Sequence, residues 1–486
     1  MAFYEYNVLV FVVVVAGTAY LQHRRGSKAA VAKRQGQDGE AARATVTAGD
    51  ALIWQFKKKF LPVYLLAFGS DWLQGPYIYT MYKDEKGLPE ETVAHLFATG
   101  FLAAAISASF VGSLADRYGR RSASLFFCVA YALSCFTVLF DSIFILFAGR
   151  ILGGLSTTLL WSVIESWMVT EFHRQHLEEA GSLSDIFGIM TTLNGAVAIL
   201  AGLFAQTIAD FTETQAAPFM AAVVLLILAF GFISSRWSEN YGDSHKSNVD
   251  GLLPGSEEKE KNGLQYIVQG RKSSQFFEYV TDRFGPDKRL WALCITSSCF
   301  EGVMYLWIFF KFAALKLSHE AAGTGTELPF GTIFAALMCA MMLGSLFFTY
   351  YSSLATSRWV VSPSRLLTIT LFVASACFIL PVLVHNEAVT FWCFCIFEIC
   401  CGVYFPSIAR LKEQIVEDGV RAKIYGILRI PLNIFVVLGL MLTKSGKSRP
   451  DPPSLEPRLR HRENVFIICS GALAAAAAAL GAFVAE

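Results

Sequence analysis

Charged residues are scarce in this sequence. Only 16% of its 486 residues are Asp, Glu, Lys or Arg, whereas an ordinary soluble domain carries about 25%. Because 54% of the residues are hydrophobic, the composition excludes the two or three soluble domains that the length alone suggests. The formal net charge of +1 gives no indication of a nucleic-acid partner.

The sequence also lacks the motifs of enzymes and of ATP-driven pumps. It has no G-x-x-x-x-G-K-[ST] loop for nucleotide phosphates, no nucleophile motif, and no pair of histidine and acid at metal-ligand spacing. The 11 cysteines fall inside apolar runs, so we interpret them as small packing residues and not as a disulfide framework or a zinc site. We expect neither an enzyme nor a bound metal or cofactor.

Long apolar runs, in contrast, recur along the whole chain. Runs of about 18 residues or more can cross the roughly 30 Å hydrocarbon core as helices. These runs are apolar all round and do not alternate as the strands of a membrane barrel do, so we predict an all-α, multi-pass membrane protein. The expected spans are Phe3–Leu21, Leu61–Tyr82, Thr92–Ala115, Ser122–Phe140, Ile143–Thr170, Ser182–Asp210, Ala216–Arg236, Leu290–Leu315, Pro329–Tyr351, Arg365–Val384, Ala388–Arg410, Lys423–Leu442 and Asn464–Val484.

The spans divide the chain into five segments. We expect a membrane anchor at residues 1–22, a basic cytosolic segment at 23–59, a six-helix bundle at 60–236, a polar cytosolic linker at 237–288 and a second six-helix bundle at 289–486. The N-terminal residues MAFYEYN are acidic and basic sequence follows the first span, which is the reverse of a cleaved signal peptide. We therefore expect a retained helix with its N-terminus outside.

The distribution of lysine and arginine sets the orientation. Neither residue occurs in the short loops DSI, FTETQAAP and HNEA, whereas Lys57–Lys59, Arg117–Arg121 and the segment from Lys412 to Lys423 are basic. Because basic loops remain in the cytosol, we place the basic set there. One basic loop, KSGKSRPDPPSLEPRLRHREN, falls on the opposite side and conflicts with this assignment.

The two predicted bundles repeat one another. The stretch Gly181–Met190 (GSLSDIFGIM) resembles Gly419–Leu428 (GVRAKIYGIL), with glycine at two matching positions. Asp71 and Glu301 each lie near the middle of the first helix of their bundle. Repeats of this kind are typical of secondary transporters, whose substrate site lies between the repeats.

A charged stretch, GSLADRYGRR, follows the second core helix as a predicted cytosolic loop. Gly112 would allow a helix end to approach a neighbour closely, and Asp116 can face a helix N-terminus. Arg117, Arg120 and Arg121 can pair with carboxylates or lipid phosphates. We expect these five residues to form a charged latch between the bundles; a plain positive-inside loop is the alternative.

This stretch resembles the signature loop G-x-L-A-D-R-x-G-R-R of the major facilitator superfamily. Further stretches resemble its molybdate-anion transporter branch, namely DWLQGPYIY from Asp71, GRILGGLSTTLLWSVIESW from Gly149, CGVYFPSIARL from Cys401 and LRIPL around Arg429. The resemblance implies two six-helix bundles with an extra leading helix, a cytosolic gate at the charged stretch, and molybdate uptake at the cell membrane by alternating access. The second half keeps Gly344 but has no equally clear copy of the loop.

Molybdate is a tetrahedral dianion, so its carrier needs hydrogen-bond donors and positive charge rather than metal ligands. Arginine suits an oxyanion best, and Arg150 and Arg429 lie within predicted spans, where charges are costly and usually functional. Tyr404, Gln74 and Tyr77 are further candidate substrate contacts. The alternatives are ion-pair struts for the arginines and packing or interface roles for the tyrosines.

Acids within the spans bear on the energy source. A dianion that enters against an inside-negative potential costs about 4.6 kcal/mol per 100 mV, so uptake calls for coupling, for example to protons carried by desolvated carboxylates. Asp71, Glu165, Glu301 and Glu398 are the candidate coupling acids, with Asp185 as a further acid in a span. Salt bridges to Arg150, Arg429 or Lys311 are the alternative role for each.

Two other functions remain open. A carrier on this fold can take another small solute, such as sulfate, an organic anion or a sugar, because a fold does not fix its substrate. A non-transporting membrane sensor can share the fold as well. The charges within the spans and the charged stretch argue against the sensor, which would need neither.

Overall fold

The apolar runs fold into long helices, as predicted. The computed structural model describes residues 2–34, 40–242, 288–323, 328–353, 362–416, 421–441 and 455–484, and within them all regular structure is helical. The longer helices are α1 (Ala2–Arg34), α2 (Glu40–Gln74), α4 (Glu90–Ser107), α5 (Val111–Tyr118), α6 (Arg120–Thr137), α7 (Ile143–Arg174), α8 (Leu183–Thr212), α9 (Ala217–Arg236), α13 (Lys288–Ala322), α14 (Phe330–Ser353), α15 (Pro363–Leu383), α16 (Glu387–Ile415), α17 (Arg421–Met441) and α18 (Leu455–Phe483). Short turns of helix are α3 (Ile78–Thr80), η1 (Met81–Glu85) and η2 (Leu177–Glu179).

Most of these helices are long and apolar enough to cross a membrane. In the described part of the chain nine helices qualify singly, and the bent pair α4 and α5 qualifies together. Helices α2, α6 and α17 correspond to the other three predicted spans, and they contain more polar residues than the nine that qualify. The chain is therefore an all-α, multi-pass membrane protein.

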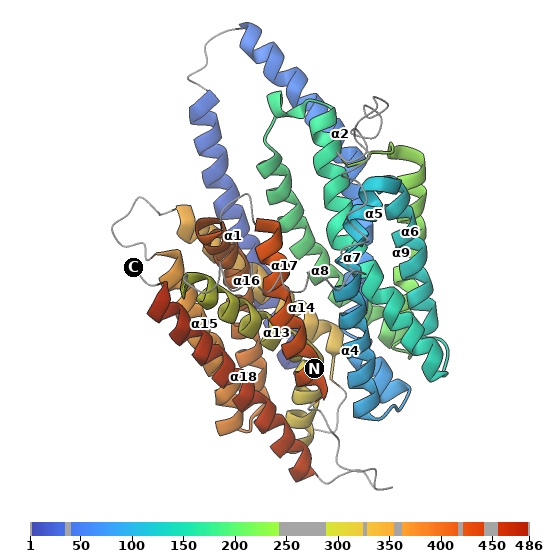
Figure 1. The fold of residues 1–486 in the computed structure, drawn as a ribbon, viewed down its shortest axis with the longest axis vertical. Helices are drawn as coiled ribbons and strands as arrows, with labels where there is room; N and C mark the ends of the chain where they lie inside the picture. The colour runs from blue at the N-terminus through green and yellow to red at the C-terminus, as the bar shows by residue number, and fades with distance from the viewer. Residues whose placement is uncertain are drawn as a thin grey trace, which may run out of the picture.

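The helices form two bundles that lie side by side (Figure 1). Helices α2 to α9 form one bundle and α13 to α18 the other, and in each bundle the second and fourth membrane helices pack through glycine. A Cβ atom on Gly154 of α7 would clash with the carbonyl oxygen of Gly100 on α4, and one on Gly402 of α16 would lie 3.0 Å from the Cα of Gly344 on α14. Only glycine permits such close helix contact, so the matched pairs agree with the repeat seen in the sequence.

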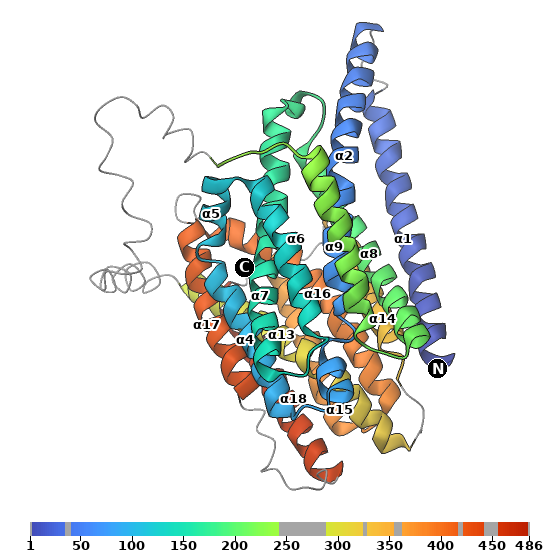
Figure 2. The ribbon, with the colours of Figure 1, turned by 90° about the vertical axis from the view of Figure 1, so that its right-hand side faces the viewer.

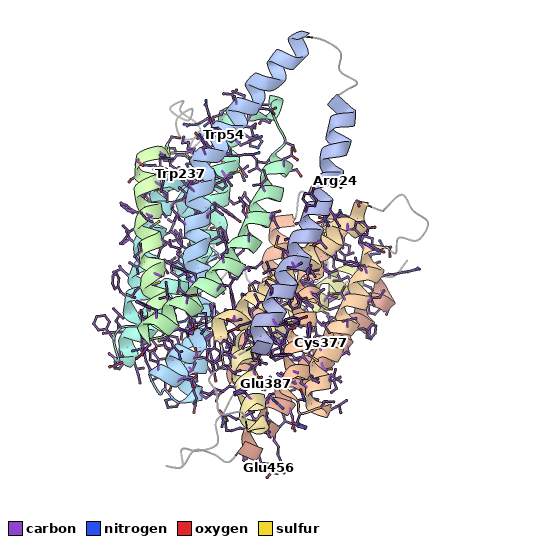
Figure 3. The ribbon with its side chains drawn as sticks, turned by 180° about the vertical axis from the view of Figure 1, so that it is seen from behind. Arg24, Trp54, Trp237, Cys377, Glu387 and Glu456 are labelled. Atoms are coloured by element: carbon purple, nitrogen blue, oxygen red, sulfur yellow. The ribbon has the colours of Figure 1, made fainter. Side chains whose placement is uncertain are left out.

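The leading helix α1 packs on the bundle that is distant in sequence. It lies against α14, where Gln22 Nε2 donates a hydrogen bond to the carbonyl oxygen of Leu346 at 2.7 Å. The Tyr4 hydroxyl donates to Glu387 on α16. Figures 2 and 3 show α1 running along the C-terminal bundle, while α2 runs back into the N-terminal bundle. Much of the basic segment 23–59 is therefore the end of one long helix and the start of another.

Two predicted spans are broken. Helix α2 stops at Gln74, directly before a Gly-Pro pair, and the short turns α3 and η1 continue the first core span. The second core span bends by 51° between α4 and α5. The expected loop at Gly112–Arg121 is thus a correction: α5 extends to Tyr118 and α6 begins at Arg120. Gly119 alone turns the chain, with a φ of 104° that suits glycine.

The N-terminal bundle includes the first residues of the expected linker. Trp237 is buried and its ring stacks on Trp167 with 3.8 Å between centroids, and Asn240 Nδ2 donates to the carbonyl oxygen of Trp167 at 3.1 Å (Trp237 is labelled in Figure 3). Residues that follow α9, among them Trp237 and Asn240, therefore pack on the N-terminal bundle. Residues 243–287 of the linker lie outside the described residues.

The basic loop that conflicted with the orientation is partly helical. Helix α18 begins at Leu455, so three arginines lie on its first turns. Arg458 pairs with Glu320 at 2.8 Å, and Arg462 Nη1 donates to the Ser318 hydroxyl at 2.7 Å. Because an acid balances Arg458 and Arg462 is buried against α13, this segment presents less free positive charge than its composition suggests.

Candidate functional site

Two of the expected site residues come together in the N-terminal bundle. The Asp71 carboxylate on α2 accepts a hydrogen bond from the Tyr131 hydroxyl on α6, and the Arg150 guanidinium acts on it electrostatically. Arg150 Nε donates to the carbonyl oxygen of Leu96 at 3.3 Å. A Cβ atom on Gly100 would lie 2.6 Å from Arg150 Nη2, so glycine makes room for the guanidinium. Arg150 thus interacts with Asp71 through its charge, while its guanidinium hydrogen-bonds to the backbone of α4.

Gln74 and Tyr77 have different partners, although both were candidate substrate contacts. Gln74 is buried and its Nε2 donates to the carbonyl oxygen of Ser70 at 3.0 Å, within its own helix. The Tyr77 hydroxyl donates to Gln206 Oε1 at 3.0 Å, and the same oxygen accepts from the backbone nitrogen of Gly331 at 2.8 Å. Tyr77 therefore belongs to the contact between the two bundles.

A second polar group lies between α13 and α16 in the C-terminal bundle. The Tyr404 hydroxyl donates to Glu301 Oε1 at 3.1 Å, and Lys412 Nζ lies 3.7 Å from the same oxygen. The Tyr404 ring stacks on Phe300 with 3.8 Å between centroids. About a fifth of the side-chain surface of Glu301 (21%) and of Lys412 (20%) is exposed, so solvent ions can reach this acid and base.

The buried acid Glu398 faces a lysine that the sequence analysis named only as a possible ion-pair partner. Glu398 and Lys311 are each 4% exposed and interact electrostatically. The Lys311 ammonium lies 4.9 Å from the ring centres of Trp307 and Phe334. The sequence could have indicated Lys311 as a functional residue, because it is a lysine within an apolar run.

Three other expected residues are placed differently. Glu165 is on an exposed face of α7, where it acts electrostatically on Tyr64. Asp185 lies exposed in the first turn of α8. Arg429 falls on α17, but its side chain lies outside the described residues.

The charged stretch forms its contacts within the N-terminal half. Arg120 Nη2 lies 2.7 Å from Asp116 Oδ1, and Arg120 Nη1 donates to the carbonyl oxygen of Ser166 at 3.2 Å. Arg121 Nη2 donates to the carbonyl oxygen of Ser234 at 2.9 Å, and the Arg117 guanidinium lies 5.7 Å from the ring centre of its neighbour Tyr118. The latch between the bundles stays a prediction: in the described part of the chain, the partners of these residues lie on α5, α6, α7, α9 and the residues that follow α9.

Glu239, which the sequence analysis missed, takes the place expected for Asp116. Its carboxylate accepts hydrogen bonds from the backbone nitrogens of Arg121 and Ser122 at 2.7 and 3.1 Å, so it binds the positive end of α6. A Cβ atom on Gly119 would clash with this carboxylate, whereas one on Gly112 would meet nothing within 4 Å. The close approach expected at Gly112 occurs at Gly119 instead.

The two halves meet through aromatic rings and glycines. Lys316 Nζ at the end of α13 also pairs with Asp84 Oδ1 of η1 at 2.7 Å, and a Cβ atom on Gly202 would lie 3.0 Å from the ring of Phe334. These contacts close the side of the molecule on which η1 lies. The ring pairs across the contact, with the distances between their centroids, are Trp72 and Phe334 (6.1 Å), Tyr77 and Phe330 (6.4 Å), Tyr79 and Phe309 (5.3 Å), Phe97 and Phe309 (5.1 Å), and Phe101 and Tyr305 (5.0 Å).

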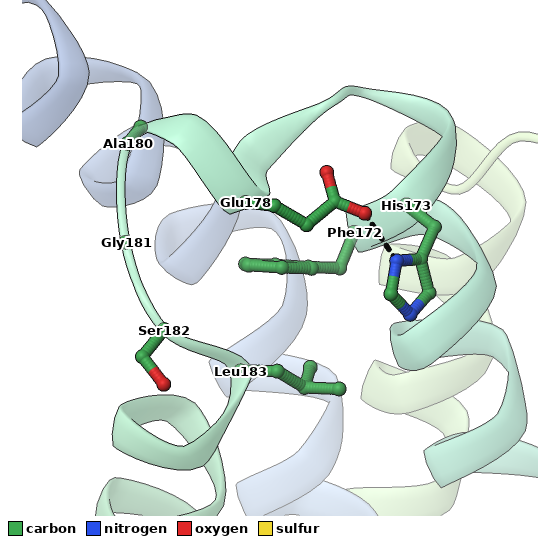
Figure 4. A pocket seen from close by; sticks show the side chains of 7 residues that line it. All are labelled: Phe172, His173, Glu178, Ala180, Gly181, Ser182 and Leu183. Carbon is green, nitrogen blue, oxygen red and sulfur yellow. Dashed lines mark hydrogen bonds and ion pairs between the residues drawn. The ribbon is translucent and has the colours of Figure 1, made fainter.

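A surface pocket lies elsewhere, at the end of α7. Figure 4 shows it between Phe172 and the turn at Gly181, with His173 hydrogen-bonded to Glu178. That hydrogen bond is the main reason that the pKa of Glu178 is below its ordinary value. This acid–base pair is about half exposed, and its acid does not suit an anion. No group of three or more histidine, cysteine or acidic side chains within the described residues is arranged to hold a metal ion.

Known proteins resemble this chain over most of its length. The family model described as sugar transporters with 12 transmembrane segments matches residues 26–254 and 267–393. The molybdate-anion transporter of Takifugu rubripes is 31% identical over 393 residues, which are 80% of this chain and 79% of that protein. The molybdate-anion transporter of Danio rerio is 30% identical over 446 residues, 90% of this chain and 88% of that protein.

A solved structure shares the fold. The nucleoside transporter NupG matches with a TM-score of 0.63 at 11% identity, over 87% of this chain and 98% of that one. The likeness at so low an identity concerns the architecture of two helical bundles. Together with the relatives above, it shows that the chain belongs to the molybdate-anion transporter family of the major facilitator superfamily.

Proposed function

We propose that this chain carries molybdate across the cell membrane by alternating access, with the uptake coupled to an ion such as the proton. The observation that carries the proposal is that three basic side chains within the membrane helices each have an acidic partner. Arg150 faces Asp71 in one half, while Lys412 pairs with Glu301 in the other. Lys311 and Glu398 form the third pair.

Such pairs suit an oxyanion as cargo. Unpaired charge at membrane depth is costly, so an empty carrier is more stable when each base has an acid beside it. A dianion brings two negative charges, and it can replace a carboxylate as the partner of a base. The displaced carboxylate is then a natural place for a proton, which would link anion entry to proton entry and oppose the electrical cost of about 2.3 kcal/mol per charge per 100 mV.

The contact between the halves supports alternating access. Its described rings and the Lys316–Asp84 ion pair gather on one side of the molecule. Edge-on and tilted ring contacts and one partly exposed ion pair can separate without unfolding either bundle. Rocking of one bundle against the other would break these contacts and open the side that is now closed.

A sugar is the second candidate cargo, and the description of the matching family as sugar transporters is the observation that favours it. Neutral sugars need hydrogen-bonding groups, but they do not need basic residues at membrane depth. Arg150 and Lys311, which lie within the predicted spans and each interact with an acid, therefore favour an oxyanion over a sugar.

Uptake of labelled molybdate tests the proposal. Cells without their own molybdate carrier would express the full chain, its Arg150→Gln variant and, as a control, Arg460→Gln, which alters an exposed pair with Glu456. We expect saturable uptake by the wild type and the control, loss in Arg150→Gln at equal surface expression, and little competition from glucose. Absence of molybdate uptake by wild type that reaches the cell surface would refute the proposed cargo.

A further inference from the structure

Lys311 is a buried cation with an unusual environment. Only 4% of the residue is exposed, and its ammonium group lies over the rings of Trp307, Phe312 and Phe334 at 4.9, 5.1 and 4.9 Å from their centres. Among the residues that the structure describes, no hydrogen-bond acceptor or carboxylate oxygen lies within bonding distance of its Nζ. Ring faces attract a cation, but they leave its three N–H donors without acceptors.

A second unused donor lies one turn earlier on the same helix. The indole Nε1 of Trp307 is buried and has no hydrogen-bond partner, although only 2% of the residue is exposed. Residues four apart share one face of a helix, so Trp307 and Lys311 present an N–H donor and a cation on the same face of α13. Buried donors normally have acceptors, and an unpartnered indole N–H beside a buried cation indicates a ligand that supplies acceptor oxygens.

The acid that balances Lys311 comes from α16. Glu398 is equally buried and interacts with Lys311 through space, without a direct ion pair. The same two helices form a second acid–base pair nearer the other membrane face, with the roles exchanged. There α13 supplies the acid, Glu301, and α16 supplies the base, Lys412. The two positions on α13 are separated by about 15 Å at 1.5 Å per residue. Helices α13 and α16 thus hold two cations at different depths.

Phe334 links this group to the N-terminal half. Its ring lies against Lys311 and also contacts Trp72, with 6.1 Å between centroids. Cβ atoms added to Gly75 or Gly202 would each lie 3.0 Å from it. Phe334 belongs to the C-terminal half, but residues of the N-terminal half pack against its ring and keep it over Lys311. Separation of the halves on this side would free the ring to move away from Lys311.

We propose that Lys311 and the indole N–H of Trp307 bind a tetrahedral oxyanion, and that Glu398 is the competing partner of Lys311 in the empty carrier. This inference rests on the proposed function and names a contact for its substrate. Molybdate and sulfate share the required chemistry, a dianion with four acceptor oxygens. When the halves separate, Lys311 would become accessible from the side on which Phe334 now covers it. Lys412 is the cation nearer the opposite side.

Binding measurements on the purified full-length protein test the site. Heat of binding is measured for molybdate and, separately, for sulfate. In Glu398→Gln the competing charge is gone, so we expect molybdate to bind roughly tenfold more tightly. In Lys311→Gln with Glu398→Gln both charges are removed together, which keeps the interior neutral, and we expect affinity to fall by roughly tenfold or more. Trp307→Phe keeps the ring but removes the N–H donor, and should weaken binding severalfold.

The control is Arg460→Gln with Glu456→Gln, which removes an exposed acid–base pair from α18 of the same bundle and should bind as the wild type does. Equal affinity in the wild type and in Lys311→Gln with Glu398→Gln would overturn the inference while molybdate transport stands. If the wild type neither binds nor transports either oxyanion, the proposed function fails and this site with it. If sulfate binds as tightly as molybdate and is lost in the same variants, the site stands as a general oxyanion contact.

Discussion

The carboxylate of Glu239 binds the N-terminal end of α6, with its Oε1 2.7 Å from the backbone nitrogen of Arg121. Its second oxygen accepts from the Ser122 hydroxyl at 2.7 Å. A carboxylate at this position balances the partial positive charge of the helix end. The segment that follows α9 is therefore attached to the corner between α5 and α6.

Replacing Glu239 by alanine should lower stability. The variant leaves the backbone N–H groups of Arg121 and Ser122 without their carboxylate, a loss of about 1 kcal/mol for a helix cap. Thermal unfolding of the purified protein in detergent should show a lower midpoint. Glu456→Ala, which removes an exposed acid from the start of α18, is the control and should unfold with the wild type. Identical midpoints for the two variants would show that the cap contributes nothing.

Alanine should be harmful at Gly119 and harmless at Gly112. At Gly119 the backbone has a φ of 104° and a new Cβ atom would meet the Glu239 carboxylate, so we expect a loss of about 1–3 kcal/mol. Gly112 lies on a helix beside open space, where alanine is the better helix former. Surface expression and thermal unfolding of the two variants compare them directly. A Gly112→Ala protein as unstable as Gly119→Ala would contradict the geometry.

Arg150→Lys should impair transport although it keeps the charge. Lysine has a point charge and no planar fork, so an oxyanion contact would lose roughly tenfold or more in apparent affinity. Initial rates of labelled molybdate uptake over a range of concentrations measure the change, with surface expression as the reference. If uptake depends on molybdate concentration as in the wild type, Arg150 does not contact the substrate and interacts only with Asp71.

A cross-link between the halves should stop uptake reversibly. Asp84 and Lys316 face each other across the contact at 2.7 Å, so cysteines at these two positions can be joined by a short cleavable thiol reagent. Transport should cease after cross-linking and return after cleavage, because the bundles must separate here. Lys86→Cys with Asp141→Cys is the matched control, since that 2.8 Å pair lies within one half. Continued uptake with the halves joined would argue against rocking.

The lengths and composition of the apolar runs were enough to predict the helical architecture. Local breaks had visible causes that the run lengths concealed: a Gly-Pro pair follows Gln74, and Gly119 lies between two helices. The packing of α1 on α14 had no such signal. An apolar helix surface carries little information about which neighbour it contacts, because lipid and protein are similarly apolar.

The candidate site was predictable in its residues more than in its pairings. Charge at membrane depth singled out Asp71, Arg150, Glu301 and Glu398, because burial makes such residues expensive. Their partners come from distant helices, so sequence spacing does not reveal them. The role of Glu239 was hidden for the same reason, since 118 positions separate it from Arg121.

The packing of α1 connects the two halves at a second place, in addition to the direct contact between the bundles. Helix α1 is continuous in sequence with the N-terminal bundle but rests on the C-terminal one, through Gln22 and Tyr4. It acts as an exchanged segment does in a domain-swapped dimer, here within a single polypeptide. A chain cleaved between Gly242 and Lys288 would gain this contact to hold its two fragments together, and fragments expressed separately should assemble more tightly when the first one retains α1.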